Sequence, residues 1–199
     1  MLLHEKLKGR KLILASNSPR RRQLLADAGI AFELADKYGC DETLPDHISA
    51  NDAAAYIAEL KSRAYPKQLA DNEILITADT VVIVGDTVLG KPSDRDDALR
   101  MLGLLSGETH TVTTGVMFRT NGGSRIFKVD TAVTFRGLTI EEREYYVDTC
   151  RPYDKAGAYG IQEWIGYAAV ERIEGSFYNV MGLPVQRLYT ELDNFVDEG

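Results

Sequence analysis

The sequence has few cysteines, fewer basic than acidic residues and no long hydrophobic run. Cys40 and Cys150 lie far apart with no Cys or His at metal-ligand spacing, so we expect free thiols rather than disulfides or a zinc site. The net charge of −7 disfavours nucleic acid or an anionic membrane as the main partner. No apolar run approaches the roughly 20 residues that span a bilayer, and residues 1–10 lack the apolar core of a signal peptide. A cytoplasmic location is therefore expected.

Two common catalytic motifs are also missing. The phosphate-binding pattern GxxxxGK[ST] does not occur, so the chain is not a P-loop protein. The segment "EGSFYN", residues 174–179, lacks the GxSxG elbow of many serine hydrolases. The three histidines are isolated in sequence, and nothing links them to a nucleophile. Any catalysis is expected to depend on other residue types.

The 199 residues suffice for one substantial domain, or for two lobes that share a core. Strands are expected beside helices and also in hairpins, which predicts an α/β fold with a mixed sheet flanked by helices. A capping box of Ser93 and Asp96 is expected to start one helix. The other expected helices cover residues 19–28, 51–63, 140–148 and 184–196. The expected strands are 11–15, 30–35, one ending near Asp79, 81–84, 87–89, 110–120 and 124–135, and 150–164 is expected to be an irregular loop.

Three consecutive arginines, residues 20–22, stand where the first of these helices begins. Ser18 is a good N-cap, and Pro19 suits the first helical position. Since the free amides of a helix start already carry about half a positive charge, cations there are unfavourable without an anion nearby. Hydroxyls, including that of Ser16, free amides and guanidinium groups are the donors that hold phosphate oxygens. The alternative is a basic turn paired with acidic neighbours.

Acidic side chains could supply the complementary chemistry. Asp79 in "LITADT" is expected at the end of an apolar strand, where α/β sheets present catalytic groups. A carboxylate there could hold a divalent metal or take a proton from water, although a capping or turn role is the alternative. Asp41 and Glu42 in an acidic loop are a second source of oxygen ligands for a cation such as Mg²⁺.

Lysines recur in loops that contain small residues. Lys91 lies in "LGKPSD" and Lys155 in "DKAGAYG", where glycine would let the backbone approach a ligand. Each alone could be a solvated surface lysine. Together with Lys61 and the arginines, they indicate an anionic ligand.

Six segments of the chain form a recognisable set: "ASNSPRRRQLL", "ADTVV", "GKP", "DALRMLGLLSGETHTVTTGV", "YDKAGAYGIQ" and "IEGSFYNVMGLP". Together they resemble the Maf family of nucleoside triphosphate pyrophosphatases. They occur in the family order and cover the chain from Lys11 to Phe195. The form "KAGAYGIQ" is similar to the dTTP/UTP pyrophosphatase subgroup rather than to the subgroup that acts on 7-methyl-GTP.

The resemblance implies an elongated mixed β-sheet flanked by helices, with two lobes around a deep cleft, related to the inosine triphosphate pyrophosphatases. A single catalytic domain would cover residues 11–199, after an N-terminal extension of residues 1–10. The implied reaction is hydrolysis of dTTP, UTP or modified pyrimidine triphosphates to the monophosphate and pyrophosphate. The resemblance also implies a divalent metal, Mg²⁺ or Mn²⁺, and a homodimer.

The resemblance assigns roles to individual residues. The catalytic aspartate of the family falls on Asp79, as proton acceptor or metal ligand, and its metal-site glutamate on Glu42. Gln162 can offer a donor and an acceptor to a pyrimidine edge. The substrate-binding residues would be Ser16, Ser18, Arg20, Arg21, Lys61, Thr80, Lys91, Lys155 and Gln162.

Two features depart from the family pattern. Glu163 and Trp164 follow Gln162, where the family usually continues with Gly, and "TCRP" replaces a more usual Gly-Glu-Pro run. Both lie on the side expected to contact the base.

Two other functional hypotheses stay open at this point. The chain could be a nucleotide-binding regulator of cell division and septum formation without significant turnover, or a phosphate-binding structural protein. Asp79 and Lys91 favour catalysis over the regulator, and a phosphate-binding structural protein would leave the paired carboxylate and the lysine loops unexplained.

Overall fold

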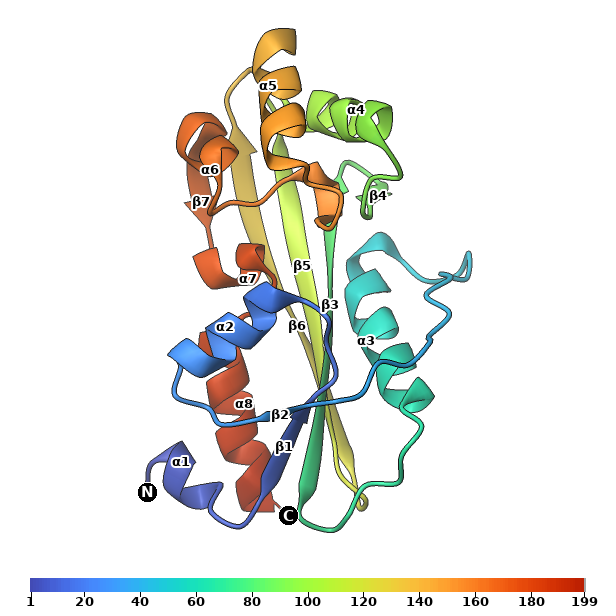
Figure 1. Cartoon of the computed structure of the whole chain (residues 1–199), viewed down its shortest axis with the longest axis vertical. Helices are drawn as coiled ribbons and strands as arrows, with labels where there is room; N and C mark the ends of the chain where they lie inside the picture. Colours follow the sequence, from blue (N-terminus) through green and yellow to red (C-terminus); the bar gives the residue numbers. More distant parts are fainter. Residues whose placement is uncertain (199) are drawn as a thin grey trace. The chain divides into compact units, whose positions relative to one another are not determined.

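The computed structural model describes residues 1–198, and the last residue of the expected domain 11–199 lies outside them. The chain forms a mixed α/β fold (Figure 1). Its strands are β1 (Lys11–Leu14), β2 (Glu33–Leu34), β3 (Glu73–Val84), β4 (Thr87–Leu89), β5 (Thr109–Arg119), β6 (Ser124–Phe135) and β7 (Val170–Glu174). Its helices are α1 (Leu3–Lys6), α2 (Pro19–Asp27), α3 (Ala53–Ala64), α4 (Arg95–Leu105), α5 (Ile140–Cys150), α6 (Trp164–Ala169), α7 (Phe177–Met181) and α8 (Val185–Glu198), with short 3-10 turns η1 (Ala50–Asp52) and η2 (Ala156–Ala158).

The strands form a seven-stranded mixed sheet, which confirms the predicted fold class. Its order is β2-β1-β3-β5-β6-β7, with β4 paired to β3 outside this path. Strand β1 runs parallel to β2 and β3, whereas the pairs β3–β4 and β6–β7 are antiparallel. The chain divides into two compact units: residues 1–79, 114–129 and 182 onward form the first, and residues 80–113 and 130–181 form the second. Strands β3, β5 and β6 contribute residues to both.

In the first unit, α3 and α8 both pack on the long strands. The Thr77 hydroxyl of β3 donates a 2.7 Å hydrogen bond to the Ala58 carbonyl of α3. On α8, the Phe195 ring lies 5.8 Å from the ring of Phe118 in β5. A Cβ on Gly115 of β5 would lie 2.5 Å from the Ala54 carbonyl, so α3 touches the strand backbone at this point.

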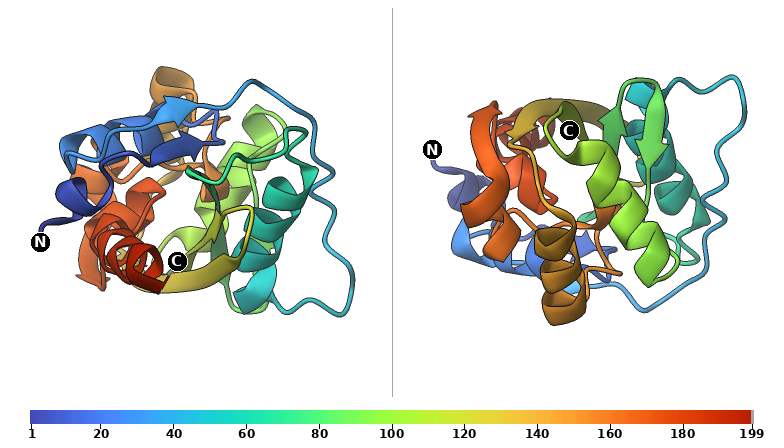
Figure 2. Two further views of the ribbon diagram at one scale, coloured as in Figure 1. Left: turned by 90° about the horizontal axis from the view of Figure 1, so that it is seen from below. Right: turned by 90° about the horizontal axis from the view of Figure 1, so that it is seen from above.

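The first ten residues belong to the same unit. The short helix α1 lies against α8 (Figures 1 and 2). Leu3 is buried, and the Lys6 ammonium forms ion pairs of 2.9 Å with Asp193 and 2.7 Å with Asp197. The N-terminal segment, to which the sequence assigned no role, therefore packs on the C-terminal helix.

In the second unit, helices α4 and α5 pack together over a core that includes Leu102, Phe135 and Tyr146 (Figures 1 and 2). His110 is buried in this core, and its Nε2 atom lies 2.8 Å from the Tyr159 hydroxyl. Burial lowers the pKa of His110 to about 4, so the ring is neutral at pH 7. His110 therefore acts as a packed, uncharged core residue.

The expected end of a strand near Asp79 is wrong, because β3 continues from Glu73 to Val84. The N-terminal part of β3 pairs with β1 and its C-terminal part pairs with β4, so both ends keep the backbone extended. The intervening "TADT" contains no Gly or Pro to break the strand. Asp79 thus lies in the middle of a strand.

The expected capping box of Ser93 and Asp96 is wrong by one residue. Asp94 is the N-cap of α4 and accepts a 2.8 Å hydrogen bond from the Asp97 amide, while Asp97 accepts one from the Ser93 amide. The two candidate patterns have the same spacing. An ionised carboxylate is the better acceptor at the positive end of a helix, which favours Asp94.

Several boundaries also differ from expectation. Strand β2 keeps only two residues of the expected 30–35, and α5 extends to Cys150 before Arg151 adopts a left-handed φ of 48°. The sequence did not indicate α6, β7 or α7. Both cysteines are free, as predicted, and β3 and β4 form the hairpin expected around Gly85. Within residues 1–198, no helix is long and apolar enough to cross a membrane.

Candidate functional site

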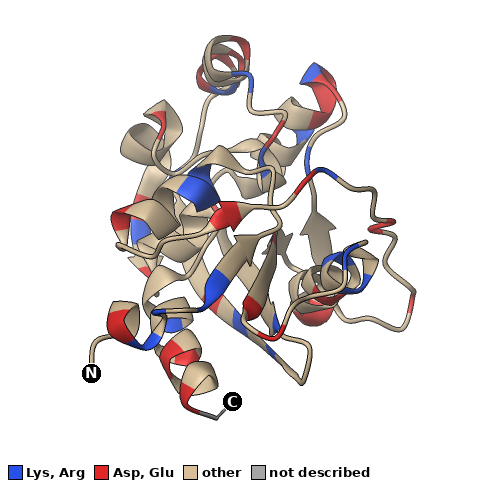
Figure 3. Ribbon diagram, turned by 60° about the horizontal axis from the view of Figure 1, so that its bottom comes forward, with Lys and Arg blue, Asp and Glu red and all other residues tan. Residues whose placement is uncertain are grey.

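The start of α2 has the geometry that its sequence predicts. Ser18 is the N-cap, its hydroxyl accepts a hydrogen bond from the Arg21 amide, and Pro19 occupies the first turn. The Ser18 amide in turn donates a 3.2 Å hydrogen bond to the Ser16 hydroxyl. Residues 20–22 at this end of α2 are all arginine, and the ribbon is coloured blue for them (Figure 3). The two hydroxyls and the positive helix end thus form one donor-rich corner of the first unit.

Arg21 is buried and bonded to the protein itself. Its Nε atom donates a 2.7 Å hydrogen bond to the Gly182 carbonyl, and Nη1 donates a 2.9 Å bond to the Ala78 carbonyl. Burial lowers the pKa of Arg21, and the nearby Asp79 carboxylate partly opposes this effect. Arg20, by contrast, is half-buried. Arg21 therefore ties the start of α2 to the strand residue that precedes Asp79.

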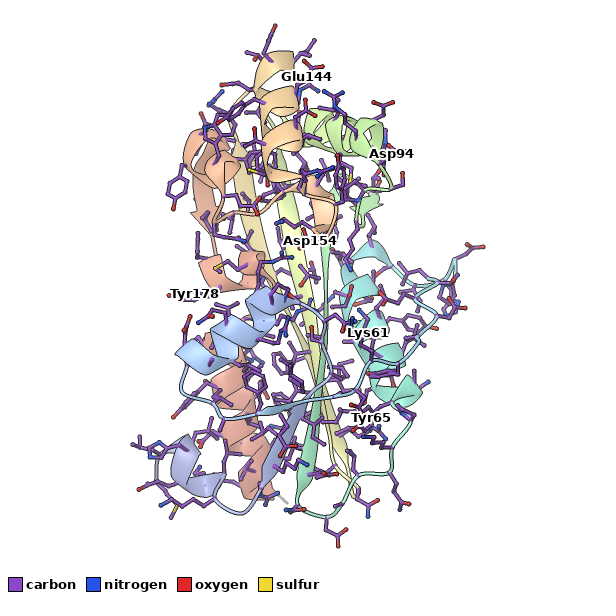
Figure 4. The ribbon with its side chains drawn as sticks, in the orientation of Figure 1. Lys61, Tyr65, Asp94, Glu144, Asp154 and Tyr178 are labelled. Carbon is purple, nitrogen blue, oxygen red and sulfur yellow. The ribbon has the colours of Figure 1, made fainter. Side chains whose placement is uncertain are left out.

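Lys61 joins the two carboxylates that the sequence selected. It extends from α3 (Figure 4), and its Nζ atom lies 2.7 Å from Asp79 Oδ1 and 3.2 Å from Glu42 Oε2. The side chains of Lys61 and Asp79 are 18% and 15% exposed, whereas that of Glu42 is 48% exposed. The fold therefore brings together a strand, a helix and the acidic loop.

The same pair of carboxylates is suited to a divalent metal. Among residues 1–198 there is no group of three or more His, Cys, Asp or Glu side chains that could hold a metal ion. Asp79 and Glu42 nevertheless converge on one cation, the Lys61 ammonium. Mg²⁺ in proteins often takes only one or two carboxylates and completes its shell with water and substrate phosphates. The donor chemistry of the pair fits such a metal.

The remaining expected residues, Thr80, Lys91, Lys155 and Gln162, belong to the second unit. The Gly157 amide donates a 3.0 Å hydrogen bond to the Gly90 carbonyl, which joins the Lys155 loop to the Lys91 loop. Gly157 has a φ of +66°, and a Cβ there would lie 2.9 Å from the Val82 side chain. Only glycine fits this contact, so the two lysine loops depend on it.

The lysines differ in their environments. Lys91 is exposed, whereas the Lys155 side chain is only 9% exposed. The Lys155 ammonium lies 2.7 Å from Asp154 Oδ1 and 3.0 Å from Glu163 Oε1. Asp154 is labelled in Figure 4. A solvated surface lysine is therefore excluded for Lys155.

Gln162 lies in the same segment as Lys155. Within the part of the chain that the structure describes, its Oε1 atom is buried and has no hydrogen-bond partner. A buried acceptor without a partner is costly, so this amide is suited to a ligand that donates a hydrogen bond.

Sequence reasoning missed Tyr146 and the contacts of Glu163. The Tyr146 hydroxyl donates to Glu163 Oε2 and accepts a 2.9 Å hydrogen bond from the Gly160 amide. In the sequence, Glu163 stands out only as a departure from the family pattern. The signal that could have found this contact is a tyrosine on the buried face of a helix. Tyr146 is fully buried, and a buried tyrosine hydroxyl needs a hydrogen-bond partner.

A family model and two curated relatives match this chain over almost its whole length. The model of the family described as "Maf-like protein" matches residues 11–195. A protein of Parabacteroides distasonis named dTTP/UTP pyrophosphatase is 53% identical over 96% of this chain and 99% of its own length. One of the same name from Phocaeicola vulgatus is 52% identical over 94% of this chain and 97% of its own. Among solved structures, the Staphylococcus aureus Ham1 protein matches 63% of this chain and 72% of its own at 16% identity and a TM-score of 0.42, which is too distant to bear on function.

Proposed function

The chain belongs to the Maf-like protein family, and we propose that it hydrolyses dTTP and UTP to the nucleoside monophosphate and pyrophosphate. The observation that carries this proposal is the 53% identity, over 96% of the chain, to the P. distasonis protein named dTTP/UTP pyrophosphatase. The acidic and basic residues of both units support it, because phosphoanhydride hydrolysis needs charge neutralisation and one oriented water. Modified pyrimidine triphosphates are proposed as further substrates.

Asp79 is the proposed catalytic residue. It accepts a proton from the water that attacks the α-phosphorus. The bond between the α-phosphorus and the oxygen that bridges it to the β-phosphorus breaks, and pyrophosphate leaves. Lys61 supports this role, since its ammonium lies 2.7 Å from Asp79 Oδ1 and holds the carboxylate in one orientation. The charge of Lys61 can also neutralise a phosphate oxygen.

A divalent cation, Mg²⁺ or Mn²⁺, is the proposed cofactor. Glu42 and Asp79 would hold it, because both carboxylates already converge on one cationic group. When bound, the ion would neutralise charge on the phosphate oxygens.

Phosphate-binding residues are proposed in each unit separately. In the first unit they are the hydroxyls of Ser16 and Ser18 at the start of α2, with Arg20, Arg21 and Lys61. Because the Arg21 guanidinium donates to two backbone carbonyls, its part is to add charge and to fix the helix start. In the second unit they are Thr80, Lys91 and Lys155. The burial of Lys155 supports its assignment, since a buried ammonium interacts strongly with an anion.

Two further properties are proposed from the family resemblance alone. The chain acts as a homodimer, and the reaction takes place in the cytoplasm with the nucleoside triphosphate as its small-molecule partner.

The direct test is release of pyrophosphate from a panel of ribo- and deoxyribonucleoside triphosphates with Mg²⁺ or Mn²⁺. We expect UTP and dTTP to be cleaved fastest, with the monophosphate as the second product, and EDTA to stop the reaction. Release of inorganic phosphate instead would contradict the proposed bond cleavage. Binding of nucleotides without turnover would favour a regulator over an enzyme.

Gln162 is the proposed base-selecting residue. Its buried Oε1 atom can accept a hydrogen bond from N3–H of uracil or thymine, whereas N3 of cytosine is itself an acceptor. The Gln162→Ala variant should therefore lower the ratio of kcat/KM for UTP to that for CTP by about tenfold. The exposed Gln186 provides the matched control, Gln186→Ala, which should leave the ratio unchanged. An unaltered ratio in Gln162→Ala would remove this residue from base recognition.

A further inference from the structure

A chain of polar contacts connects α5 to the segment that carries Lys155 and Gln162. Tyr146 on α5 is fully buried, and its hydroxyl donates to Glu163 Oε2. The other oxygen of the same carboxylate, Oε1, lies 3.0 Å from the Lys155 ammonium. The Glu163 carboxylate thus uses one oxygen for the tyrosine and the other for the lysine.

The backbone of the segment is held at the same point. The Tyr146 hydroxyl accepts a 2.9 Å hydrogen bond from the Gly160 amide, and the Glu163 amide donates a 2.9 Å bond to the Gly160 carbonyl. A Cβ on Gly160 would lie 2.9 Å from both Lys155 Cε and Glu163 Cδ. A side chain at this position would push these two side chains away from the backbone over which they meet.

Helix α6 contacts the same segment. A Cβ on Gly166 would overlap the Ile161 carbonyl oxygen, so the first turn of α6 packs directly on the backbone that precedes Gln162. Glu163 is the N-cap residue of α6, but its side chain does not cap the helix. The carboxylate contacts Tyr146 and Lys155 instead.

Electrostatics keep the Tyr146 hydroxyl protonated. Burial and the adjacent Glu163 carboxylate raise the pKa of Tyr146 far above its ordinary value, so its hydroxyl remains a hydrogen-bond donor. The Lys155 ammonium forms ion pairs with Glu163 and with Asp154, whose Oδ1 atom lies 2.7 Å away. The lysine is therefore held between two carboxylates, only one of which Tyr146 fixes.

We propose that Tyr146 and Glu163 are positioning residues that hold Lys155 and Gln162 in place to receive the nucleotide. This inference rests on the proposed nucleotide-hydrolysing function, because it assigns a role to residues around that substrate. Neither side chain needs to touch the reacting atoms. Removal of the tyrosine hydroxyl leaves a half-buried carboxylate oxygen and the buried Gly160 amide without this partner, and both belong to the segment between Lys155 and α6.

The test compares Tyr146→Phe and Glu163→Gln with wild-type enzyme. For both variants we expect KM for UTP to rise about tenfold with kcat within about twofold, and the preference for UTP over CTP to fall. Calorimetry on UTP with Ca²⁺ in place of Mg²⁺ should give a Kd about tenfold weaker without depending on turnover. Glu163→Asp, which keeps the charge, should recover part of the affinity.

The neighbouring Tyr145→Phe is the matched control. Tyr145 is 53% exposed, and its substitution should change neither KM nor Kd. Thermal melts give the folded fraction of every variant. A role in stability alone would lower the melting temperature or kcat for all substrates equally while KM, Kd and the base ratio stay constant, and that result would overturn the proposal.

The outcomes separate this inference from the proposed function. If wild type binds UTP but releases no pyrophosphate, the enzymatic proposal fails, and the Kd of the variants still decides the positioning role. If wild type is active and the Tyr146→Phe enzyme keeps the wild-type KM, Kd and base ratio, only the positioning role fails. If wild type neither binds nor cleaves any triphosphate, both fail.

Discussion

The Asp79→Asn variant is expected to lose pyrophosphate release by about 10³-fold in kcat/KM while it remains folded. Asparagine has nearly the same shape as aspartate, so β3 and its neighbours should keep their packing. The amide cannot accept the proton of the attacking water, and loss of a general base costs about 10² to 10⁴ in rate. The Lys61 ammonium also loses its 2.7 Å partner, which adds to the loss.

The measurement is initial-rate pyrophosphate release from UTP, with circular dichroism to verify folding. Asp46→Asn, in an exposed loop position, is the matched control and should retain wild-type activity. A folded Asp79→Asn enzyme with activity within twofold of wild type would rule out Asp79 as the catalytic residue. A large fall in metal affinity together with activity would instead assign it chiefly to metal binding.

The Gly115→Ala variant is expected to show the largest loss of stability, about 3 kcal/mol or more. Gly115 lies inside β5, and an added Cβ would lie 2.5 Å from the carbonyl carbon and oxygen of Ala54. Both are backbone atoms at the start of α3, so no flexible side chain can move aside. Strand and helix must separate, and the hydrogen bond between Thr77 and Ala58 is strained with them.

Urea unfolding measures this loss, and Gly122→Ala in the β5–β6 turn is the control. Gly122 has no atom within 4 Å of an added Cβ, so its free energy of unfolding should change by less than about 0.5 kcal/mol. Because Lys61 extends from α3, the Gly115→Ala enzyme should also be impaired in turnover. Wild-type stability in this variant would mean that α3 does not pack on β5 as described.

Much of the fold follows from local sequence signals. Ser18 and Pro19 start α2, and Gly85 turns the β3–β4 hairpin, because each acts within a few residues of its own position. The cap of α4 was misplaced by one residue for the same reason, since Ser93 and Asp94 head two patterns of equal spacing. The motifs also sufficed to recognise the family that the comparisons then supported.

Local signals could not give the contacts across the chain. The sequence selected Glu42, Lys61 and Asp79 one by one, but only the fold brings the two carboxylates to the same ammonium. Asp79 is mid-strand because β1 and β4 pair with opposite ends of β3, which no pattern around Asp79 reveals.

The basic start of α2 depends on both local and distant residues. The sequence by itself determined that cations stand at the start of α2, because helix caps and helix charge are properties of a few adjacent residues. Only the tertiary structure decided that Arg21 is buried against the Ala78 and Gly182 carbonyls, and that Tyr146 binds Glu163. Those partners are distant in sequence, and they meet because apolar burial packs their helices and strands together.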